Sequence, residues 1–358
     1  MSTHARGDLS ASDEADIDLP RLTDFLSRTV EGGLRGPLHR RLISGGRSNP
    51  TYELSDGERT WILRRPPFGE VLESAHDMMR ESRVVTALQD SVVPVPTVVA
   101  SYAGDDVLGA PFYVMDKIDG ITLRTHDDTA ELSPDQRAEL ATAMVDTMVA
   151  LHEIDPQDVG LSDFGRPEGY LERQLRRWVR QWHIVRTRQG GDVDELASRL
   201  ERAMPPLRFP GIVHGDFKID NLMVDARNPS KVLALLDWEM ATLGDTLADL
   251  GQLICFWDEP GGLYNPITAG AMAHPGFPSG EGVVREYAGR RGVEVDEIEW
   301  YILFADLKLA VILEQIHARH IAGQTVGDGF DGIGDMVPLL LDRALTRASV
   351  SGDRRLRG

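Results

Sequence analysis

The stretch from Ile212 to Asp225, IVHGDFKIDNLMVD, sets several charged and amide side chains among apolar residues. Buried charge costs free energy unless it is paired or bound to a metal ion. The runs LMV and VLALL predict two strands joined by the polar turn DARNPS. If they pair as a hairpin, Asp237 at the end of the second strand lies near Asn221, which follows Asp216 by five residues. Such oxygen ligands suit Mg²⁺, which fills its remaining positions with water and phosphate oxygens.

The composition is that of an ordinary globular protein. The 358 residues suffice for about two domains or one bilobal unit, with 42% hydrophobic and 27% charged residues. The sequence contains no run of about 18 apolar residues, so we predict no membrane span. The net charge of -19 argues against a nucleic-acid partner, and it does not identify a substrate.

The expected location is a reducing cytoplasm. The N-terminus, MSTHARGDLSASDEADIDLP, is polar and acidic and lacks the basic start and apolar core of a secretion signal. The single cysteine, Cys255, cannot form an intramolecular disulfide and lies in the apolar run LGQLICFW, which indicates a buried thiol.

The chain changes character once along its length. Residues 1–18 are predicted to be a disordered acidic tail, and residues 349–358 a second disordered tail. A β-rich region follows the first tail. It has predicted strands at 38–44, 51–55, 60–65, 97–102 and 112–118, and a helix at 73–89.

From about residue 131 the pattern is mostly helical. Ser133 is a predicted helix cap followed by Pro134 in the first turn, and apolar residues then recur at helical spacing. We therefore predict an α+β bilobal fold with an N-terminal lobe over 19–118 and a C-terminal lobe over 119–348. A cleft between the lobes is the expected ligand site.

The order H-x-D-x-x-x-x-N, followed by an aspartate ending the next hairpin, matches the catalytic layout of the protein-kinase superfamily. With HGD, LLDWE and GDTLADLG, the chain resembles the aminoglycoside phosphotransferase family, which has the protein-kinase-like fold. A closer resemblance, to the kinase-like domains fused to some acyl-CoA dehydrogenases, rests on the segments SGGRSNPTYEL, WILRRPP, HGDFKIDNLMVD and LDWEMATLGDTLADLG. The resemblance covers roughly residues 20–345.

The resemblance implies a role for each polar residue of the opening stretch. Asp216 orients the acceptor hydroxyl or takes its proton, and Lys218 offsets charge on the transferred phosphoryl group. Asn221 and Asp237 hold Mg²⁺ against the nucleotide phosphates. His214 is expected to be structural, and Asp220 is expected to be solvated.

The ATP-binding residues are expected in the N-terminal lobe. Gly45, Gly46 and Ser48 resemble the loop that positions the nucleotide, and no Walker A sequence occurs. Arg64 takes the place of the usual third-strand lysine, with Glu81 as its helix partner. Arg65 is expected to point to the opposite face, as a surface residue.

The connector FYVMDKIDG and two later helical regions complete the expected site. Met115 is expected to line the adenine pocket, with the Asp116 carbonyl and the Ile118 N–H bonding the base. The helical regions around 168–205 and 298–322 are expected to wall the acceptor pocket. Candidate contacts for an anionic acceptor there are Arg173, Arg177, Lys308 and Arg319.

The expected function is transfer of the γ-phosphoryl group of ATP to a hydroxyl of a small molecule, with Mg²⁺. The resemblance favours a hydroxyacyl thioester or a hydroxy acid as acceptor, and the alternative is an aminoglycoside or a choline-type amino alcohol. A second alternative is an ATP-binding pseudokinase with a regulatory or scaffold role. Only the presence of Arg64 in place of the usual lysine favours it. The sequence does not give the oligomeric state or the preference for ATP over GTP.

Overall fold

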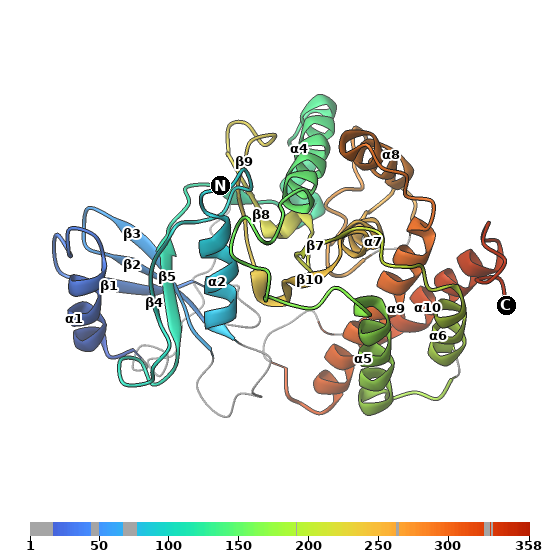
Figure 1. Cartoon of the computed structure of the whole chain (residues 1–358), viewed down its shortest axis with the longest axis horizontal. Coiled ribbons are helices and arrows are strands. Elements are labelled where there is room, and N and C mark those ends of the chain that lie inside the picture. Colours follow the sequence, from blue (N-terminus) through green and yellow to red (C-terminus); the bar gives the residue numbers. More distant parts are fainter. Residues whose placement is uncertain are drawn as a thin grey trace. The chain divides into compact units, whose positions relative to one another are not determined.

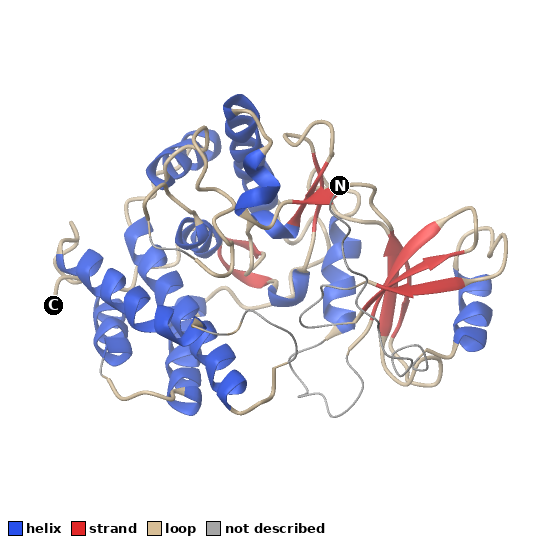
Figure 2. Cartoon of the chain, turned by 180° about the vertical axis from the view of Figure 1, so that it is seen from behind, coloured by secondary structure: helices blue, strands red, loops and turns tan. Residues whose placement is uncertain are grey.

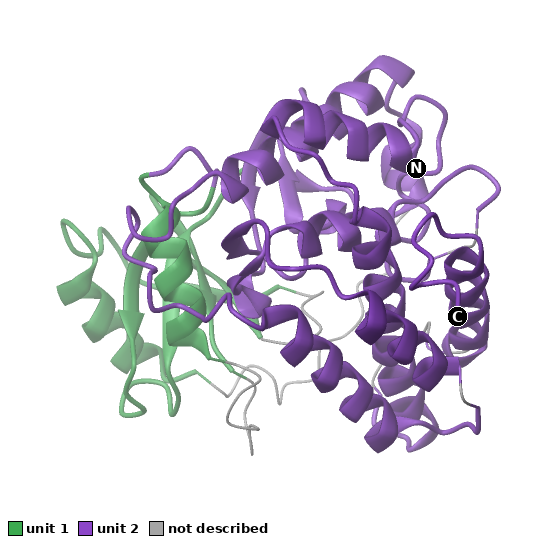
Figure 3. Cartoon of the chain, turned by 45° about the vertical axis from the view of Figure 1, so that its right-hand side comes forward, with its two compact units in different colours: residues 1–90, 95–119 green, residues 91–94, 120–358 purple. Residues whose placement is uncertain are grey.

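The computed structural model describes residues 17–43, 50–66, 77–190, 192–262, 265–325, 330 and 332–358. The chain divides into two compact units, shown in green and purple in Figure 3. Unit 1 comprises residues 1–90 and 95–119, and unit 2 comprises residues 91–94 and 120–358. Segment 91–94 contacts unit 2 through Pro94, whose carbonyl accepts from the Leu235 amide at 2.7 Å.

Unit 1 contains a five-stranded antiparallel sheet in the order β1-β2-β3-β5-β4 (Figures 1 and 2). Its strands are β1 (His39–Leu42), β2 (Thr51–Ser55), β3 (Thr60–Arg64), β4 (Val98–Tyr102) and β5 (Phe112–Asp116). Each coincides with a strand predicted from the sequence, with ends that differ by a few residues.

Two helices, α1 (Leu19–Thr29) and α2 (Met78–Leu88), pack on opposite faces of this sheet. Side chains alternate between the faces of a strand. Phe112 therefore packs with the core of α1, while Tyr113 packs with Met78 of α2. The sequence did not predict α1, which begins after the cap Asp18. The predicted helix over 73–89 is described from residue 78, because 67–76 lie outside the described residues.

Unit 2 contains two small antiparallel sheets. One has the order β6-β8-β9, and the other pairs β7 with β10. The strands are β6 (Ile121–Thr122), β7 (Pro210–Val213), β8 (Leu222–Val224), β9 (Val232–Leu235) and β10 (Thr242–Asp245). The predicted hairpin is present, because Leu222 pairs with Leu235 across β8 and β9.

Helices form the rest of unit 2. They are α3 (His126–Ala130), α4 (Pro134–His152), α5 (Tyr170–Val185), α6 (Asp192–Ala203), α7 (Leu247–Phe256), α8 (Gly280–Arg291), α9 (Ile298–Ile321) and α10 (Ile333–Ser349). The predicted start of α4 is confirmed, since Ser133 and Gln136 form a reciprocal capping box and Pro134 occupies the first turn. The long helix α9 packs against both α7 and α10.

The expectation of a frayed C-terminal tail is wrong. After α10, the side chains of Ser351 and Leu356 are buried, and Arg199 of α6 donates to the Arg357 carbonyl at 3.0 Å. Burial of an apolar side chain and charge-assisted bonds to carbonyls compensate the loss of chain entropy here. The first sixteen residues lie outside the described residues, and Ile17 is already buried. None of the described helices has the length and apolar character needed to cross a membrane.

Candidate functional site

The loop that follows β7 holds Asp216 beside Asn221. The 3₁₀ turn Ile219–Asn221 leads from this loop into β8. The Leu236 amide donates to the Asn221 carbonyl at 2.8 Å, so the residue before Asp237 is bonded to Asn221. Asp237 follows Asn221 by sixteen positions and Asp216 by twenty-one. The three residues thus lie at one end of the β8–β9 hairpin.

Asp216 is held by three side chains. Lys218 Nζ donates to its Oδ2 at 2.6 Å, and Asn221 Nδ2 donates to the same oxygen at 3.0 Å. Asn221 Nδ2 also bonds the Asp216 carbonyl at 2.8 Å. The third donor is Gln252 of α7, whose Nε2 lies 3.2 Å from Oδ1. The carboxylate is therefore fixed in orientation, while a quarter of its side chain, 25%, remains exposed to a partner.

Lys218 is part of the same ionic group. Its side chain is only 12% exposed, and its ammonium also lies 3.7 Å from Asp220 Oδ2. Burial acts against the charged form, but the carboxylates of Asp216 and Asp220 prevail and raise the pKa of Lys218. The expectation that Asp220 is solvated is wrong, because one of its oxygens is buried and burial raises its pKa.

Asp237 has a left-handed backbone, with φ 66° and ψ 65°. Non-glycine residues seldom adopt this conformation, which costs on the order of 1 kcal/mol, and aspartate tolerates it better than most residues. Such strain persists where the surrounding structure imposes it and is frequent at functional sites. It therefore supports a functional role for Asp237.

The backbone before Asp216 is fixed by a buried acid, Asp249 of α7. Its two oxygens accept from the His214 amide at 2.7 Å and the Gly215 amide at 2.8 Å. Gly215 has φ +83°, and a Cβ there would lie 2.7 Å from the Met240 carbonyl oxygen. A glycine is required at this position because it alone avoids that clash and adopts the conformation freely.

His214 is fully buried and has a structural role, as predicted. Its Nδ1 accepts from the Asp216 amide at 3.2 Å, so the proton is on Nε2, which lies 3.0 Å from the Leu236 carbonyl. The neutral imidazole thus joins the loop of Asp216 to the strand end that precedes Asp237.

A second buried imidazole, His152 of α4, supports Asp249. Its Nε2 lies 3.2 Å from Asp249 Oδ2, and its Nδ1 lies 2.8 Å from the Tyr287 hydroxyl. Burial lowers the pKa of both His152 and His214, although Asp249 acts in the opposite direction on each. Both rings are therefore neutral in the folded protein at neutral pH.

These buried neutral imidazoles make stability depend on pH. The unfolded chain takes up protons near pH 6.5, and the folded chain does so only at lower pH. The folded state therefore loses stability as pH falls below about 6.5, by about 1.4 kcal/mol per pH unit for each histidine. Urea unfolding at pH 7.5 and 5.5 measures this loss. NMR imidazole shifts showing either ring charged in the folded protein at pH 6.5 would contradict the expectation.

In unit 1, the predicted ion pair is present. Arg64 Nη1 lies 2.7 Å from Glu81 Oε1, with 12% and 2% of the side chains exposed. Arg64 faces α2 because it follows Ile62 at the two-residue period of β3, and Ile62 packs against the α2 cluster. Arg65 is not the expected surface residue: it is buried, and its Nε donates to the Pro66 carbonyl at 3.1 Å.

The other predicted nucleotide residues divide into two groups. Met115 is buried on the α2 face of the sheet, Asp116 ends β5, and Ile118 is half-buried just beyond it. Gly45, Gly46 and Ser48 lie outside the described residues.

The four predicted acceptor contacts do not form one cluster. Lys308 of α9 reaches the Asp216 loop, where its Nζ donates to the Gly215 carbonyl at 2.7 Å. Arg177 of α5 and Lys308 both lie 5.7 Å from the ring centre of Trp178. Arg173 is bonded to the carbonyls of Arg166 and Glu168. Arg319 is exposed near the end of α9.

Two residues that bond the Asp216 loop, Asp249 and Gln252, received no role in the sequence analysis. Both lie in or just after the quoted motif GDTLADLG, three residues apart on one face of α7. Their spacing was a usable signal, but only the fold shows that this face meets the Asp216 loop.

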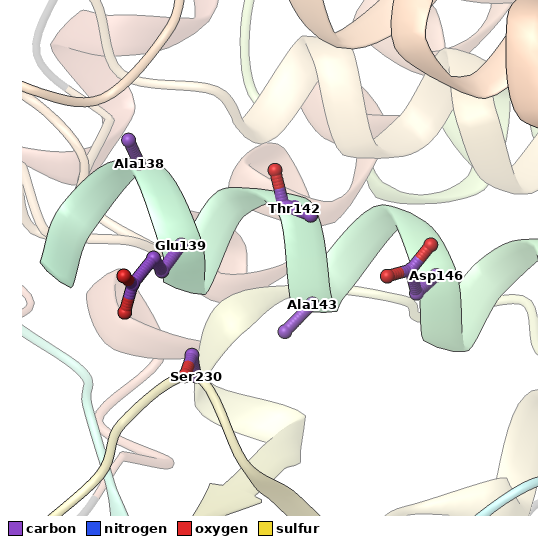
Figure 4. A pocket seen from close by; sticks show the side chains of 6 residues that line it. All are labelled: Ala138, Glu139, Thr142, Ala143, Asp146 and Ser230. Atoms are coloured by element: carbon purple, nitrogen blue, oxygen red, sulfur yellow. The ribbon is translucent and has the colours of Figure 1, made fainter. Parts of the chain in front are cut away.

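A hollow of about 390 Å³ elsewhere in unit 2 contains none of the predicted site residues. It lies along α4 near Ser230, and Figure 4 shows its lining residues. Two of them are bonded to α8: Thr142 donates to Glu286 at 2.9 Å, and Asp146 pairs with Arg290. These polar side chains are therefore engaged within the protein.

Comparison with known proteins relates the chain to phosphotransferases. Residues 39–287 match the model of the phosphotransferase enzyme family, APH. Mouse acyl-CoA dehydrogenase family member 10 is 31% identical over 340 residues, which is 92% of this chain and 31% of that protein. Chicken acyl-CoA dehydrogenase family member 11 is 32% identical over 92% of this chain and 43% of its own length. This chain thus spans less than half of these relatives.

Solved structures show the same fold. A candidate aminoglycoside phosphotransferase of Ralstonia eutropha has a TM-score of 0.82 and 29% identity, covering 94% of this chain and 99% of that one. The phosphotransferase APH(4)-Ia, solved with AMP-PNP and hygromycin B, has a TM-score of 0.58 and 17% identity, covering 92% and 99%. The expected protein-kinase-like fold is confirmed.

Proposed function

Because this chain belongs to the phosphotransferase enzyme family, with a hydroxyl group as acceptor, we propose that it transfers the γ-phosphoryl group of ATP to a small molecule. One observation carries the proposal: the Asp216 carboxylate is fixed by Lys218, Asn221 and Gln252 and still partly exposed. A carboxylate so placed can orient a hydroxyl and take its proton.

In the proposed reaction, the acceptor oxygen forms a bond to the γ-phosphorus as the bond to the ADP oxygen breaks. The hydroxyl proton passes to Asp216, and ADP leaves with the electron pair of the broken bond. Lys218, held beside Asp216, offsets negative charge on the moving phosphoryl group. In this account, positioning of the two reactants supplies most of the rate enhancement.

The residues present fit a magnesium ion. Asn221 uses both Nδ2 hydrogens on Asp216, so its side-chain amide oxygen Oδ1 is the atom left to face a ligand. Asp237 is proposed to supply the carboxylate ligand, from a left-handed backbone position. One carboxylate and one amide oxygen, completed by water and phosphate, are a usual set for Mg²⁺, which would offset negative charge on the phosphates.

Replacement of Asp237 by alanine tests this assignment. Asp237→Ala removes the carboxylate ligand, so we expect Mg·ATP to bind about 10- to 100-fold more weakly, with little loss of affinity for metal-free nucleotide. Isothermal titration with and without Mg²⁺ measures both affinities. An unchanged affinity for Mg·ATP would remove Asp237 from the metal site.

Five residues of unit 1 are proposed to contact the nucleotide: Arg64, Glu81, Met115, Asp116 and Ile118. The ion pair of Arg64 with Glu81 supports this, because it fixes a permanent cation on β3. Gly45, Gly46 and Ser48 remain proposed phosphate contacts. The alternative of a pseudokinase depended on Arg64, and the presence of this pair makes a catalytic protein the favoured proposal.

The proposed acceptor is a hydroxyacyl thioester or a hydroxy acid. The support is the identity of more than 30% with two acyl-CoA dehydrogenase family members. Arg173, Arg177 and Arg319 are proposed contacts for the anionic part of the acceptor. The competing acceptors are aminoglycosides, which two structural neighbours bind according to their descriptions, and choline-type amino alcohols.

Release of ADP across a panel of acceptors tests the function. The panel contains hydroxyacyl-CoA thioesters, free hydroxy acids, aminoglycosides and choline, each with Mg·ATP. We expect turnover with the first two classes. Preferential turnover of aminoglycosides would show that they, and not hydroxyacyl compounds, are the acceptors. Nucleotide binding without turnover of any acceptor would favour the pseudokinase with a regulatory or scaffold role.

A further inference from the structure

A half-buried lysine on α9 is bonded to the loop that carries Asp216. The Lys308 ammonium donates to the Gly215 carbonyl at 2.7 Å and to Gln252 Oε1. Burial lowers the pKa of Lys308, while the carboxylates of Asp216 and Asp249 oppose that effect. Its position over the Trp178 ring, 5.7 Å from the ring centre, further favours the cation.

Lys308 determines how the Gln252 amide is oriented. An ammonium group has only donors, so it selects the oxygen of an adjacent amide. The Gln252 Oε1 must therefore face Lys308, and the Nε2 group must face the other way, where it donates to Asp216 Oδ1 at 3.2 Å. Without the cation, either end of the amide can face the carboxylate.

The hydrogen bonds of Asp216 leave room for one more donor on one oxygen. A carboxylate oxygen offers about two acceptor sites. Oδ2 uses both, for Lys218 and Asn221, whereas Oδ1 uses one, for Gln252. A hydroxyl proton would be received at Oδ1, next to the Gln252 amide.

We propose that Lys308 and Gln252 are positioning residues that hold the Asp216 carboxylate with Oδ1 open to the acceptor hydroxyl. The proposal rests on the proposed function, because it gives Asp216 the acceptor role. It changes the role of Lys308 from a direct acceptor contact to a residue that acts through Gln252. Since the reacting groups must be placed within a fraction of an ångström, a loosened carboxylate lowers turnover more than binding.

The kinetic test uses Lys308→Met, Gln252→Leu and the double variant. Each single variant is expected to lower kcat by about 10- to 100-fold, with KM for ATP within about threefold of wild type. The double variant is expected to be no slower than the slower single variant, because the two residues act in series.

Arg137→Met is the matched control. Arg137 is a buried cation of unit 2 that, like Lys308, donates to main-chain carbonyls. Its acceptors are the carbonyls of Thr129, Ala130 and Pro275, none of which belongs to the Asp216 loop. The Arg137→Met variant is expected to lose about as much thermal stability as Lys308→Met. At temperatures well below its melting temperature, it is expected to keep the kcat of the wild type. If Lys308→Met keeps more than half of kcat, or if the double variant shows the product of the two single losses, the inference is wrong.

A crystal structure of Lys308→Met gives a readout that needs no acceptor. We expect the hydrogen bond between Gln252 and Asp216 Oδ1 to be lost and the carboxylate to rotate. An unchanged bond would overturn the inference even if the wild type were active. Conversely, wild-type protein that transfers phosphate to no acceptor would refute the proposed function, and the crystal structure would still decide the role of Lys308.

Discussion

Asp216→Asn is expected to lower kcat for phosphoryl transfer by about 10³-fold while the dissociation constant for Mg·ATP stays within about threefold. The amide is nearly isosteric with the carboxylate, but it cannot accept the acceptor proton. It also presents an NH₂ group either to Lys218 and Asn221 or to Gln252, all of which are donors in this structure. Single-turnover transfer and nucleotide titration measure the two quantities separately.

The control for this substitution lies in the same loop. Asp220→Asn makes the same chemical change next to Lys218, at a carboxylate 3.7 Å from its ammonium, but removes no group from the proposed reaction. We expect it to lower kcat by less than about tenfold. Equal losses for Asp216→Asn and Asp220→Asn, or parallel loss of transfer and nucleotide binding, would show that the role of Asp216 is misassigned.

Asp249→Asn is expected to destabilise the folded protein by about 3 kcal/mol, a large part of the usual stability of a domain. The side chain is 1% exposed and accepts from the amides of His214 and Gly215 and from His152. An asparagine has one acceptor oxygen, so at least one of these buried donors would lose its partner. Because two of them belong to the loop before Asp216, kcat should fall as well.

Urea unfolding measures the change as a shift in midpoint at constant slope. Asp353→Asn provides the comparison: its carboxylate pairs with Arg355 at 2.7 Å, with 55% of the arginine side chain and 33% of the aspartate side chain exposed. Exposed pairs contribute about 0–1 kcal/mol, so a much smaller shift is expected there. A shift for Asp249→Asn no larger than that of Asp353→Asn would contradict the proposed support of the loop.

The sequence predicted those features that local patterns encode. The strands of unit 1 alternate apolar and polar residues, and the start of α4 has a capping box with proline in the first turn. The hairpin of β8 and β9, which brings Asn221 to Leu236, follows from two apolar runs and a short polar turn. The spacing of Asp216 and Asn221 predicted that the two side chains lie close together, because both belong to one short loop.

Features that depend on distant contacts could not be predicted. The pairing of β7 with β10 joins strands about thirty positions apart, and no local signal marks Thr242–Asp245 as a strand. Period-two alternation predicted that Arg65 points away from the face of Arg64, but alternation does not show whether such a position is covered, and Arg65 is buried. Likewise, α9 is apolar over most of its length, so its sequence did not show that Lys308 bonds Gln252 and the Gly215 carbonyl.

The account depends on Asp216, Asn221 and Asp237 serving one bound nucleotide. The most direct test is a crystal structure of the protein with AMP-PNP and Mn²⁺, in which anomalous scattering locates the metal. We expect the metal within about 2.2 Å of the Asn221 amide oxygen and an Asp237 carboxylate oxygen, with the γ-phosphate next to Asp216. A metal bound without either residue, or a γ-phosphate turned away from Asp216, would contradict the proposed phosphotransferase site.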